Sequence, residues 1–273
     1  MSRAPDSIVA YYAKPVFTPS LRSQESPMVI SIDQLRSATD LAPDRIASNE
    51  ILQISSSTIV KAGWRVYMDE AETLILLAAK ITVPVPRVIS TYTIGEVGFI
   101  LMTKIECEHL SSLESNISHE ERESIAAQLK SYVAQWRKLK NCFVGSVNEG
   151  PCEDIIFKHP RDAMASVKQY GPFYSRDEYK IVFIEALRLS RPDGVWGTTE
   201  ERLKDKILAF ANTKSSTDDL GVMTHGDLHL GNIMIYNGAV SGIVDWGEAG
   251  FSLPQRESSL LPDAWPLNQV GLT

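Results

Sequence analysis

The spacing of apolar residues divides the chain into a strand-rich first part and a helix-rich second part. From Ile51 the pattern is β-like and ends at Gly63, and a period near 3.6 then predicts a helix over residues 68–79. Two further β-rich runs, 87–93 and 98–105, lie on either side of a short turn and predict a hairpin. The first part is therefore expected to be mostly sheet with one helix, whose buried face is assigned to Ala71, Leu74, Ile75 and Ala78.

Capping boxes mark the helix starts of the second part. In this motif a Ser or Thr and a Glu three residues later satisfy each other's exposed backbone amides, and it occurs at Ser118, Ser175 and Thr198. The first is followed by an apolar stripe of the kind that packs into a core, made of Ile125, Leu129, Val133, Trp136 and Leu139. The second part is therefore predicted to be mainly helical.

A β-hairpin near the C-terminus carries the most informative polar residues. Asn237-Gly238 between two β-patterned runs is a strong signal for a two-residue turn. A regular register from this turn places Asn232 opposite Ile243. It assigns one face to Asn232, Met234, Ser241, Ile243 and Asp245, and the other to Ile233, Ile235, Val240 and Val244. Asn232 and Asp245 would then be diagonal neighbours at about 7 Å, close enough to hold a magnesium–phosphate group between their oxygens.

A second carboxylate precedes this hairpin. Asp227 lies five residues before Asn232, and together with Asp245 it makes the set of polar groups used by kinase-type phosphotransferases. In that chemistry one group orients an attacking hydroxyl and two hold metal ions. Asp227 alone would more simply be a turn-stabilising residue, but its combination with the hairpin favours the functional interpretation.

Two histidines flank Asp227. His225 and His229 have the spacing of a helical zinc site, but Gly226 disfavours a helix there, so zinc is a weak alternative. We expect both histidines to support the loop through backbone hydrogen bonds.

Composition narrows the class of protein. The 273 residues carry a net charge of −7, which argues against nucleic acid or an anionic membrane as a partner bound by bulk electrostatics. No apolar run approaches the roughly 20 residues of a membrane helix, and the N-terminus lacks an apolar block of signal-peptide length. Cys107, Cys142 and Cys152 have no paired spacing, which indicates buried free thiols. These features predict a soluble cytoplasmic protein and leave its oligomeric state open.

The motif His225-Gly-Asp-Leu-His-x-x-Asn232, followed by Gly242-Ile-Val-Asp245-Trp246, resembles the aminoglycoside phosphotransferase and choline kinase family, a branch of the protein-kinase-like fold. Further blocks at 59–63, 69–72, 83–86 and 144–151 resemble its diverse fungal branch, so that the likeness runs from about Ile51 to Gly250.

The resemblance implies a two-lobed α+β fold. A loosely ordered arm at 1–27 would precede a small β-rich N-lobe at 28–103, which binds the nucleotide. The larger, mostly helical C-lobe at 104–273 would contain the catalytic hairpin and the acceptor site. Relatives continue with more helices after the hairpin, so this lobe is expected to be shortened, with its Pro- and Ser-rich tail, Phe251–Thr273, as an irregular strap.

The resemblance also implies roles for individual residues on the nucleotide side. Lys61 would grip the ATP phosphates and pair with Glu70, with Glu72 as the competing partner. Leu101, Met102 and Thr103 would line the adenine pocket. No GxGxxG loop precedes Lys61, so the turn at Ser55-Ser56-Ser57 is the candidate for a weaker phosphate contact.

The implied reaction is transfer of the γ-phosphoryl group of ATP, with magnesium, to a hydroxyl of a small molecule. Asp227 would orient and deprotonate that hydroxyl, and Asn232 and Asp245 would bind Mg²⁺. The alternative is a catalytically silent nucleotide-binding or regulatory module, which the absent glycine-rich loop and the short C-terminus favour. The identity of the acceptor, and a preference for ATP over GTP, stay open.

Overall fold

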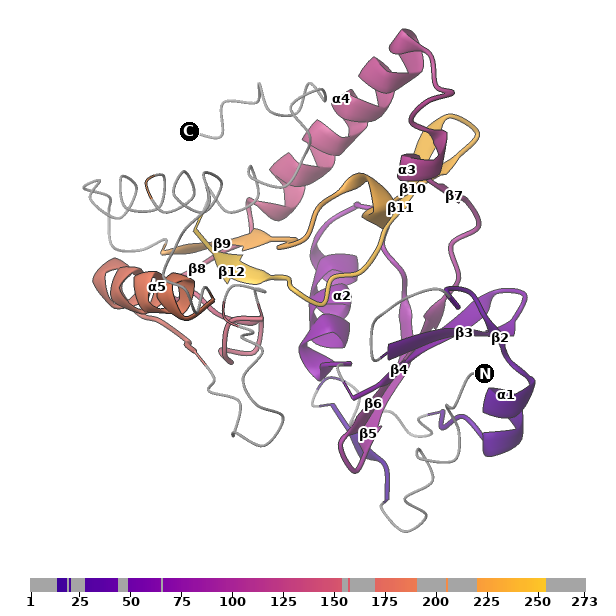
Figure 1. Cartoon of the computed structure of the whole chain (residues 1–273), viewed down its shortest axis with the longest axis horizontal. Coiled ribbons are helices and arrows are strands. Elements are labelled where there is room, and N and C mark those ends of the chain that lie inside the picture. Colours follow the sequence, from indigo (N-terminus) through magenta and orange to yellow (C-terminus); the bar gives the residue numbers. More distant parts are fainter. Residues whose placement is uncertain are drawn as a thin grey trace.

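A computed structural model of the chain describes residues 14–18, 20, 28–43, 49–64, 66–153, 157, 170–190, 205 and 220–253. The strand-rich part contains β1 (Val16–Phe17), α1 (Ile32–Ser37), β2 (Thr39–Asp40), β3 (Asn49–Ser55), β4 (Thr58–Gly63), α2 (Met68–Lys80), β5 (Val88–Ile94) and β6 (Val97–Thr103). The second part contains β7 (Glu108–His109), α3 (Leu110–Leu113), α4 (His119–Trp136), β8 (Lys140–Asn141), α5 (Arg176–Ser190), β9 (Gly221–Thr224), a 3₁₀ turn (Leu230–Asn232), β10 (Ile233–Tyr236), β11 (Ala239–Ile243) and β12 (Gly250–Ser252). Figure 1 shows these two parts beside each other, with α2 at their junction.

The strand-rich part is built on a six-stranded antiparallel sheet in the order β1-β5-β6-β4-β3-β2. Side chains alternate between its two faces, as β4 illustrates. Val60 and Ala62 are buried in a core that includes residues of β5 and β6. Ile59 and Lys61 belong to the opposite face, where Lys61 meets a residue of α2. Both faces of the central strand are therefore covered.

Helix α2 ends at Lys80, one residue after the predicted end at residue 79 and before Pro84. Its buried apolar stripe is Ala71, Leu74 and Leu77, whereas Ile75 is only partly buried and Ala78 is exposed. The expected face was therefore rotated. Several stripes at helical spacing fit this apolar sequence, and packing rather than periodicity selects one of them.

The capping boxes have different outcomes. Ser118 and Glu121 form the complete motif, with Ser118 Oγ accepting from the Glu121 amide at 3.2 Å. Ser175 caps α5 through the Glu178 amide at 3.1 Å, but the Glu178 carboxylate accepts from the Tyr174 amide at 3.3 Å and not from Ser175. The box at Thr198 lies outside the described residues. The stripe of α4 is buried from Ile125 to Trp136, with Leu139 packed against it.

The hairpin β10–β11 departs from the predicted register. Tyr236 faces Ala239 and Ile235 faces Val240, but the pairing then shifts by one residue at a β-bulge, so that Ile233 faces Ile243. Ser241 is the additional residue. As a result Ile243 is fully buried in the main core, and Met234 and Val244 line a cavity. The predicted face assignment of Ile243 and Val244 was wrong, because it assumed an unbroken ladder.

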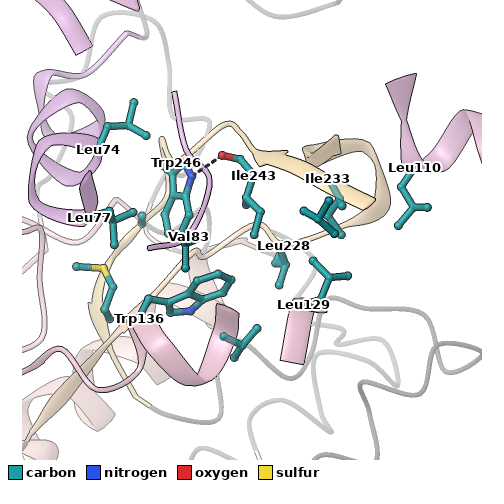
Figure 2. Packing of buried hydrophobic residues seen from close by; sticks show 14 of the residues in the cluster. Leu74, Leu77, Val83, Leu110, Leu129, Trp136, Leu228, Ile233, Ile243 and Trp246 are labelled. Atoms are coloured by element: carbon teal, nitrogen blue, oxygen red, sulfur yellow. Dashed lines mark hydrogen bonds between the residues drawn. The ribbon is translucent and has the colours of Figure 1, made fainter. Parts of the chain in front are cut away.

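An aromatic pair anchors the end of this hairpin (Figure 2). The rings of Trp136 on α4 and Trp246 meet edge to face, with centroids 5.4 Å apart. Trp246 Nε1 donates to the Ile243 carbonyl at 3.0 Å, and Leu74 and Leu77 of α2 lie in the same cluster. This core therefore connects α2, α4 and the segment that carries Asp245.

The two ends of the described chain are both attached to sheets. Strand β1 pairs with β5, so part of the predicted arm joins the large sheet. Phe251 and Ser252 belong to β12 and pair with β9, so the start of the predicted irregular tail is a strand, and residues 254–273 lie outside the described part.

All three cysteines are free, but Cys142 is exposed and the other two are only partly buried, so the expectation of buried thiols was wrong. No helix among the described residues has the length and apolarity needed to cross a bilayer.

Candidate nucleotide and catalytic site

A cavity of about 220 Å³ lies between the large sheet, α2 and the hairpin. Its wall is mainly apolar, with a few polar groups that come from both parts of the chain. The lining residues include Ile51, Ile59 and Met102 of the sheet, Met234 and Val244 of the hairpin segment, and the polar Lys61, Glu70, Asn232 and Asp245. Mainly apolar walls with a few convergent polar groups are typical of small-molecule sites.

Lys61 is the electrostatic centre of the cavity. It is only 4% exposed, and its Nζ lies 2.7 Å from Glu70 Oε2 and 2.6 Å from Asp245 Oδ1. Burial alone would lower the pKa of Lys61, but Glu70 and then Asp245 outweigh it, so the pKa lies above its ordinary value. Lys61 therefore stays charged and links α2 to the hairpin segment.

Glu70, and not Glu72, is the partner of Lys61. The Glu72 carboxylate is also buried, but it accepts hydrogen bonds from the backbone amide and the hydroxyl of Ser20. Residues two apart on a helix point in different directions, which explains why only one carboxylate faces the cavity.

Asn232 joins the cavity to Asp227. Its Nδ2 donates to the Asp227 carbonyl at 2.9 Å and lies 3.4 Å from Asp227 Oδ2. Asp227 is not part of the cavity wall, and its side chain is 41% exposed. The carboxylate thus lies beside the cavity, where a second molecule can reach it from solvent.

Asp245 is presented by an unusual backbone. Its φ is +62°, in the left-handed region that non-glycine residues seldom occupy. Gly247 follows closely, and a Cβ placed there would lie 3.3 Å from Glu70 Oε2 and 3.8 Å from Lys61 Nζ. Gly247 is therefore a site residue that the sequence reasoning missed, although the spacing Asp-x-Gly was a readable signal.

The two histidines both contact the backbone of this loop. His225 is fully buried, its Nε2 lies 3.0 Å from the Val244 carbonyl, and its Nδ1 accepts from the Asp227 amide at 3.3 Å. Burial lowers the pKa of His225 to about 4. His229 Nδ1 accepts from the Gly231 amide at 3.0 Å, and its Nε2 lies 3.6 Å from Asp227 Oδ2.

The helical geometry of a zinc site is not present here. The segment between the histidines is not helical, Gly226 has φ +83°, and a Cβ at Gly226 would lie 2.2 Å from the Glu248 carbonyl oxygen. Gly226 thus allows close packing of the loop against the chain beyond Asp245.

Of the residues predicted to contact the adenine or the phosphates, only some line the cavity. Met102 and Thr103, at the end of β6, line the cavity, whereas Leu101 points into the opposite core. Ser55 and Ser56 are exposed on the β3–β4 turn and are not among the lining residues.

The wall near Lys61 comes from a different segment. Leu41 and Ala42, which follow β2, line the cavity, and the Leu41 amide donates to the Ile51 carbonyl at 2.9 Å. In the register, Ile51 lies opposite Lys61. No motif in the sequence marked this segment. His109, which follows the linker after β6, is a further lining residue that was missed.

Comparisons with solved structures show which fold the chain has. A thermostable mutant of aminoglycoside phosphotransferase APH(4)-Ia has the same fold with a TM-score of 0.52 at 13% identity, over 81% of this chain and 70% of that one. A further variant of that mutant, in a ternary complex with AMP-PNP and hygromycin B, matches with a TM-score of 0.54 at 13% identity and the same coverage. APH(4)-Ia itself matches with a TM-score of 0.53 at 13% identity, over 81% and 69% of the two chains.

These similarities confirm the predicted two-lobed, kinase-like α+β fold. No curated protein matches in sequence. Residues 65–269 match the model of the phosphotransferase enzyme family. The matched stretch begins just after Lys61 and includes the whole motif from His225 to Asp245. The chain therefore belongs to the phosphotransferase enzyme family.

Proposed function

We propose that the protein transfers the γ-phosphoryl group of ATP, with magnesium, to a hydroxyl group of a small molecule. The observation that carries the proposal is the convergence of Lys61, Glu70, Asn232 and Asp245 on one cavity, with Asp227 bonded to Asn232 beside it. The family supports phosphoryl transfer, and the related structure with AMP-PNP and hygromycin B supports a nucleotide donor and a small-molecule acceptor. The acceptor is not named by these features, and a cytoplasmic location stays a prediction.

The residues present fit a magnesium ion that arrives with the nucleotide. Asn232 Nδ2 is engaged by the Asp227 carbonyl, so the amide oxygen is the atom that can coordinate a cation. The Asp245 carboxylate supplies a second hard oxygen. Among the described residues, no group of three or more His, Cys, Asp or Glu could hold a metal by itself. Mg²⁺ commonly binds through one or two protein oxygens together with phosphates and water, which is the donor set available here.

Each residue has a role that follows from its contacts. Lys61, held by Glu70, attracts the phosphate oxygens of the donor. Asp245 contacts Lys61 at 2.6 Å, and its carboxylate would hold the metal ion once phosphate oxygens had replaced it at Lys61. Magnesium, when bound, neutralises charge on the phosphate oxygens. Leu41, Ile59 and Met102 exclude water around the base.

Asp227 acts on the acceptor. Its carboxylate accepts the proton of the acceptor hydroxyl as the hydroxyl oxygen bonds to the γ-phosphorus. The bond from that phosphorus to the bridging β–γ oxygen breaks, and ADP and a phosphate monoester are the products. Asn232 and His229, which both contact Asp227, keep its carboxylate oriented.

Asp227→Asn tests the proposal. Release of ADP in the presence of a pool of hydroxylated metabolites should fall by about 10²- to 10⁴-fold, because the proton acceptor is lost. Binding of magnesium-ATP, measured by titration calorimetry, should be unchanged. Asp177→Asn, on the exposed first turn of α5, is the matched control and should leave both quantities at wild-type values. Full turnover by Asp227→Asn would contradict the assignment.

A second variant separates the enzyme from the regulatory alternative. Asp245→Ala removes a metal ligand and should weaken binding of magnesium-ATP. If the wild-type protein binds magnesium-ATP through Asp245 but releases no ADP with any compound of the pool, the catalytically silent module is the better description. If magnesium-ATP does not bind at all, both interpretations fail.

A further inference from the structure

We propose that Ser20 is a positioning residue of the nucleotide site, an inference that rests on the proposed function. Through Glu72, Ser20 fixes the rotation of α2 about its axis and so keeps Glu70 against Lys61. Ser20 belongs to none of the motifs described above, and it precedes Glu72 by 52 positions in the sequence.

The first argument is the contact between Ser20 and Glu72. The Ser20 amide donates to Glu72 Oε1 at 3.2 Å, and the Ser20 hydroxyl donates to Glu72 Oε2. Glu72 is only 5% exposed, and burial of a carboxylate is costly unless hydrogen-bond donors reach its oxygens. Ser20 brings one donor to each oxygen, and hydrogen bonds to a charged group are stronger than those between neutral groups.

The second argument is that the large sheet holds Ser20 in place. Phe17 of β1 pairs with Tyr92 of β5, and the centroids of their rings are 5.6 Å apart. Thr18, two residues before Ser20, is only 3% exposed. The sheet that carries Lys61 on β4 therefore also holds the segment of Ser20 at its β1 edge.

The third argument is the geometry of α2. Successive residues of an α-helix differ by about 100° around its axis, so Glu70 and Glu72 differ by about 200° and point to nearly opposite sides. Glu70 meets Lys61 on one side, and Glu72 meets Ser20 on the other. Apolar packing is non-directional, whereas two polar contacts on opposite sides of a helix fix its rotation. Without the contact to Ser20, α2 can turn, and Glu70 moves away from Lys61.

The experiment measures the affinity for magnesium-ATP by titration calorimetry. Ser20→Asp places a second carboxylate against that of Glu72 and should weaken binding by about 3- to 10-fold, which is part of the value of one hydrogen bond to a charged group. The double variant Ser20→Asp/Glu72→Gln should bind as the wild-type protein does, because the new amide can donate to the new carboxylate. Ser37→Asp, exposed at the end of α1, is the matched control and should leave the affinity unchanged.

A second measurement tests whether Ser20 acts through Glu70. In a Glu70→Ala background, Ser20→Asp should cause no further loss of affinity for magnesium-ATP, because the contact that Ser20 positions is already absent. A purely structural contact would instead lower the melting temperature in both backgrounds and leave the affinity unchanged.

The outcomes distinguish the two proposals. If the wild-type protein binds magnesium-ATP and Ser20→Asp binds it equally well, the role of Ser20 is overturned while the proposed function stands. The role is also overturned if Glu72→Gln does not restore the affinity of Ser20→Asp, or if Ser20→Asp weakens binding by the same factor with and without Glu70. If the wild-type protein does not bind magnesium-ATP, the proposed function and this inference both fail.

Discussion

Acid should destabilise the protein through His225. The folded chain keeps this imidazole neutral, with its pKa lowered by burial to about 4, whereas in the unfolded chain it returns to the ordinary value of 6.5. Below pH 6.5 the unfolded chain therefore binds a proton that the folded chain does not. The stability that depends on this difference is fully present above pH 6.5 and is lost as the pH falls from 6.5 to 4.

The size of the effect follows from these two values. Between pH 7.5 and pH 5, linkage through His225 alone lowers the free energy of unfolding by about 2 kcal/mol. The nearby Asp245 favours the charged ring, whereas His229 and Lys61 oppose it, and these influences are smaller than that of burial. About 2 kcal/mol is a large share of the stability of an ordinary domain.

Urea unfolding at the two pH values measures this contribution. Tryptophan fluorescence reports the transition, and Trp246, whose ring centroid lies 4.4 Å from that of His225, contributes to it. The wild-type protein should lose about 2 kcal/mol more than His225→Gln between pH 7.5 and pH 5, because all other titrating groups are shared. His119→Gln, at an exposed position, should follow the wild-type protein.

If the wild-type protein and His225→Gln lose the same free energy of unfolding between pH 7.5 and pH 5, His225 is not the source of the acid sensitivity. Because this variant also removes a buried contact to the Val244 carbonyl, it is expected to be less stable at every pH. Titration of the histidine ring protons by NMR in the wild-type protein provides the same test without substitution. His225 should stay neutral down to about pH 4, and protonation of its ring near pH 6.5 would refute the reasoning as well.

Three further predictions concern the fold and the site. Gly226→Ala should lower the melting temperature strongly, because φ is +83° and the new Cβ would lie 2.2 Å from the Glu248 carbonyl oxygen; an unchanged melting temperature would contradict this packing. Ser118→Ala should reduce the free energy of unfolding by about 1 kcal/mol in a urea titration, since the α4 cap is lost, while ATP affinity stays constant. Glu70→Gln should reduce ADP release severely and Glu72→Gln should not, and the opposite order would mean that the wrong carboxylate faces the nucleotide.

Elements that depend on local interactions could be predicted from the sequence. The end of α2 at Lys80 and the complete cap at Ser118 depend on residues within one or two turns of each other. The turn at Asn237-Gly238 is equally local, and both residues have the positive φ that this turn requires. The pairing of Lys61 with Glu70 was implied by the family resemblance, with Glu72 as the competing partner.

Features that depend on distant packing could not be predicted. The bulge at Ser241 allows Ile243 to enter the core beside Ile233. The sequence of the strand by itself does not indicate where such a bulge will form. Counting residues along an ideal ladder therefore gave the wrong faces even though Asn232 and Asp245 both reach the cavity. The cavity wall at Leu41 likewise arises from an edge strand with no motif of its own.

The bulge at Ser241 also limits how this hairpin can change in length during evolution. Residues near the exposed turn at Gly238 can be inserted or deleted in pairs without changing which side chains beyond the bulge face the core. Loss of Ser241, by contrast, would restore an even ladder and exchange the faces of Ile243 and Val244, so that an apolar core residue would be moved to the cavity. In an alignment of relatives, length differences should therefore gather at the turn, and the separation of Asn232 from Asp245 should vary by even numbers of residues.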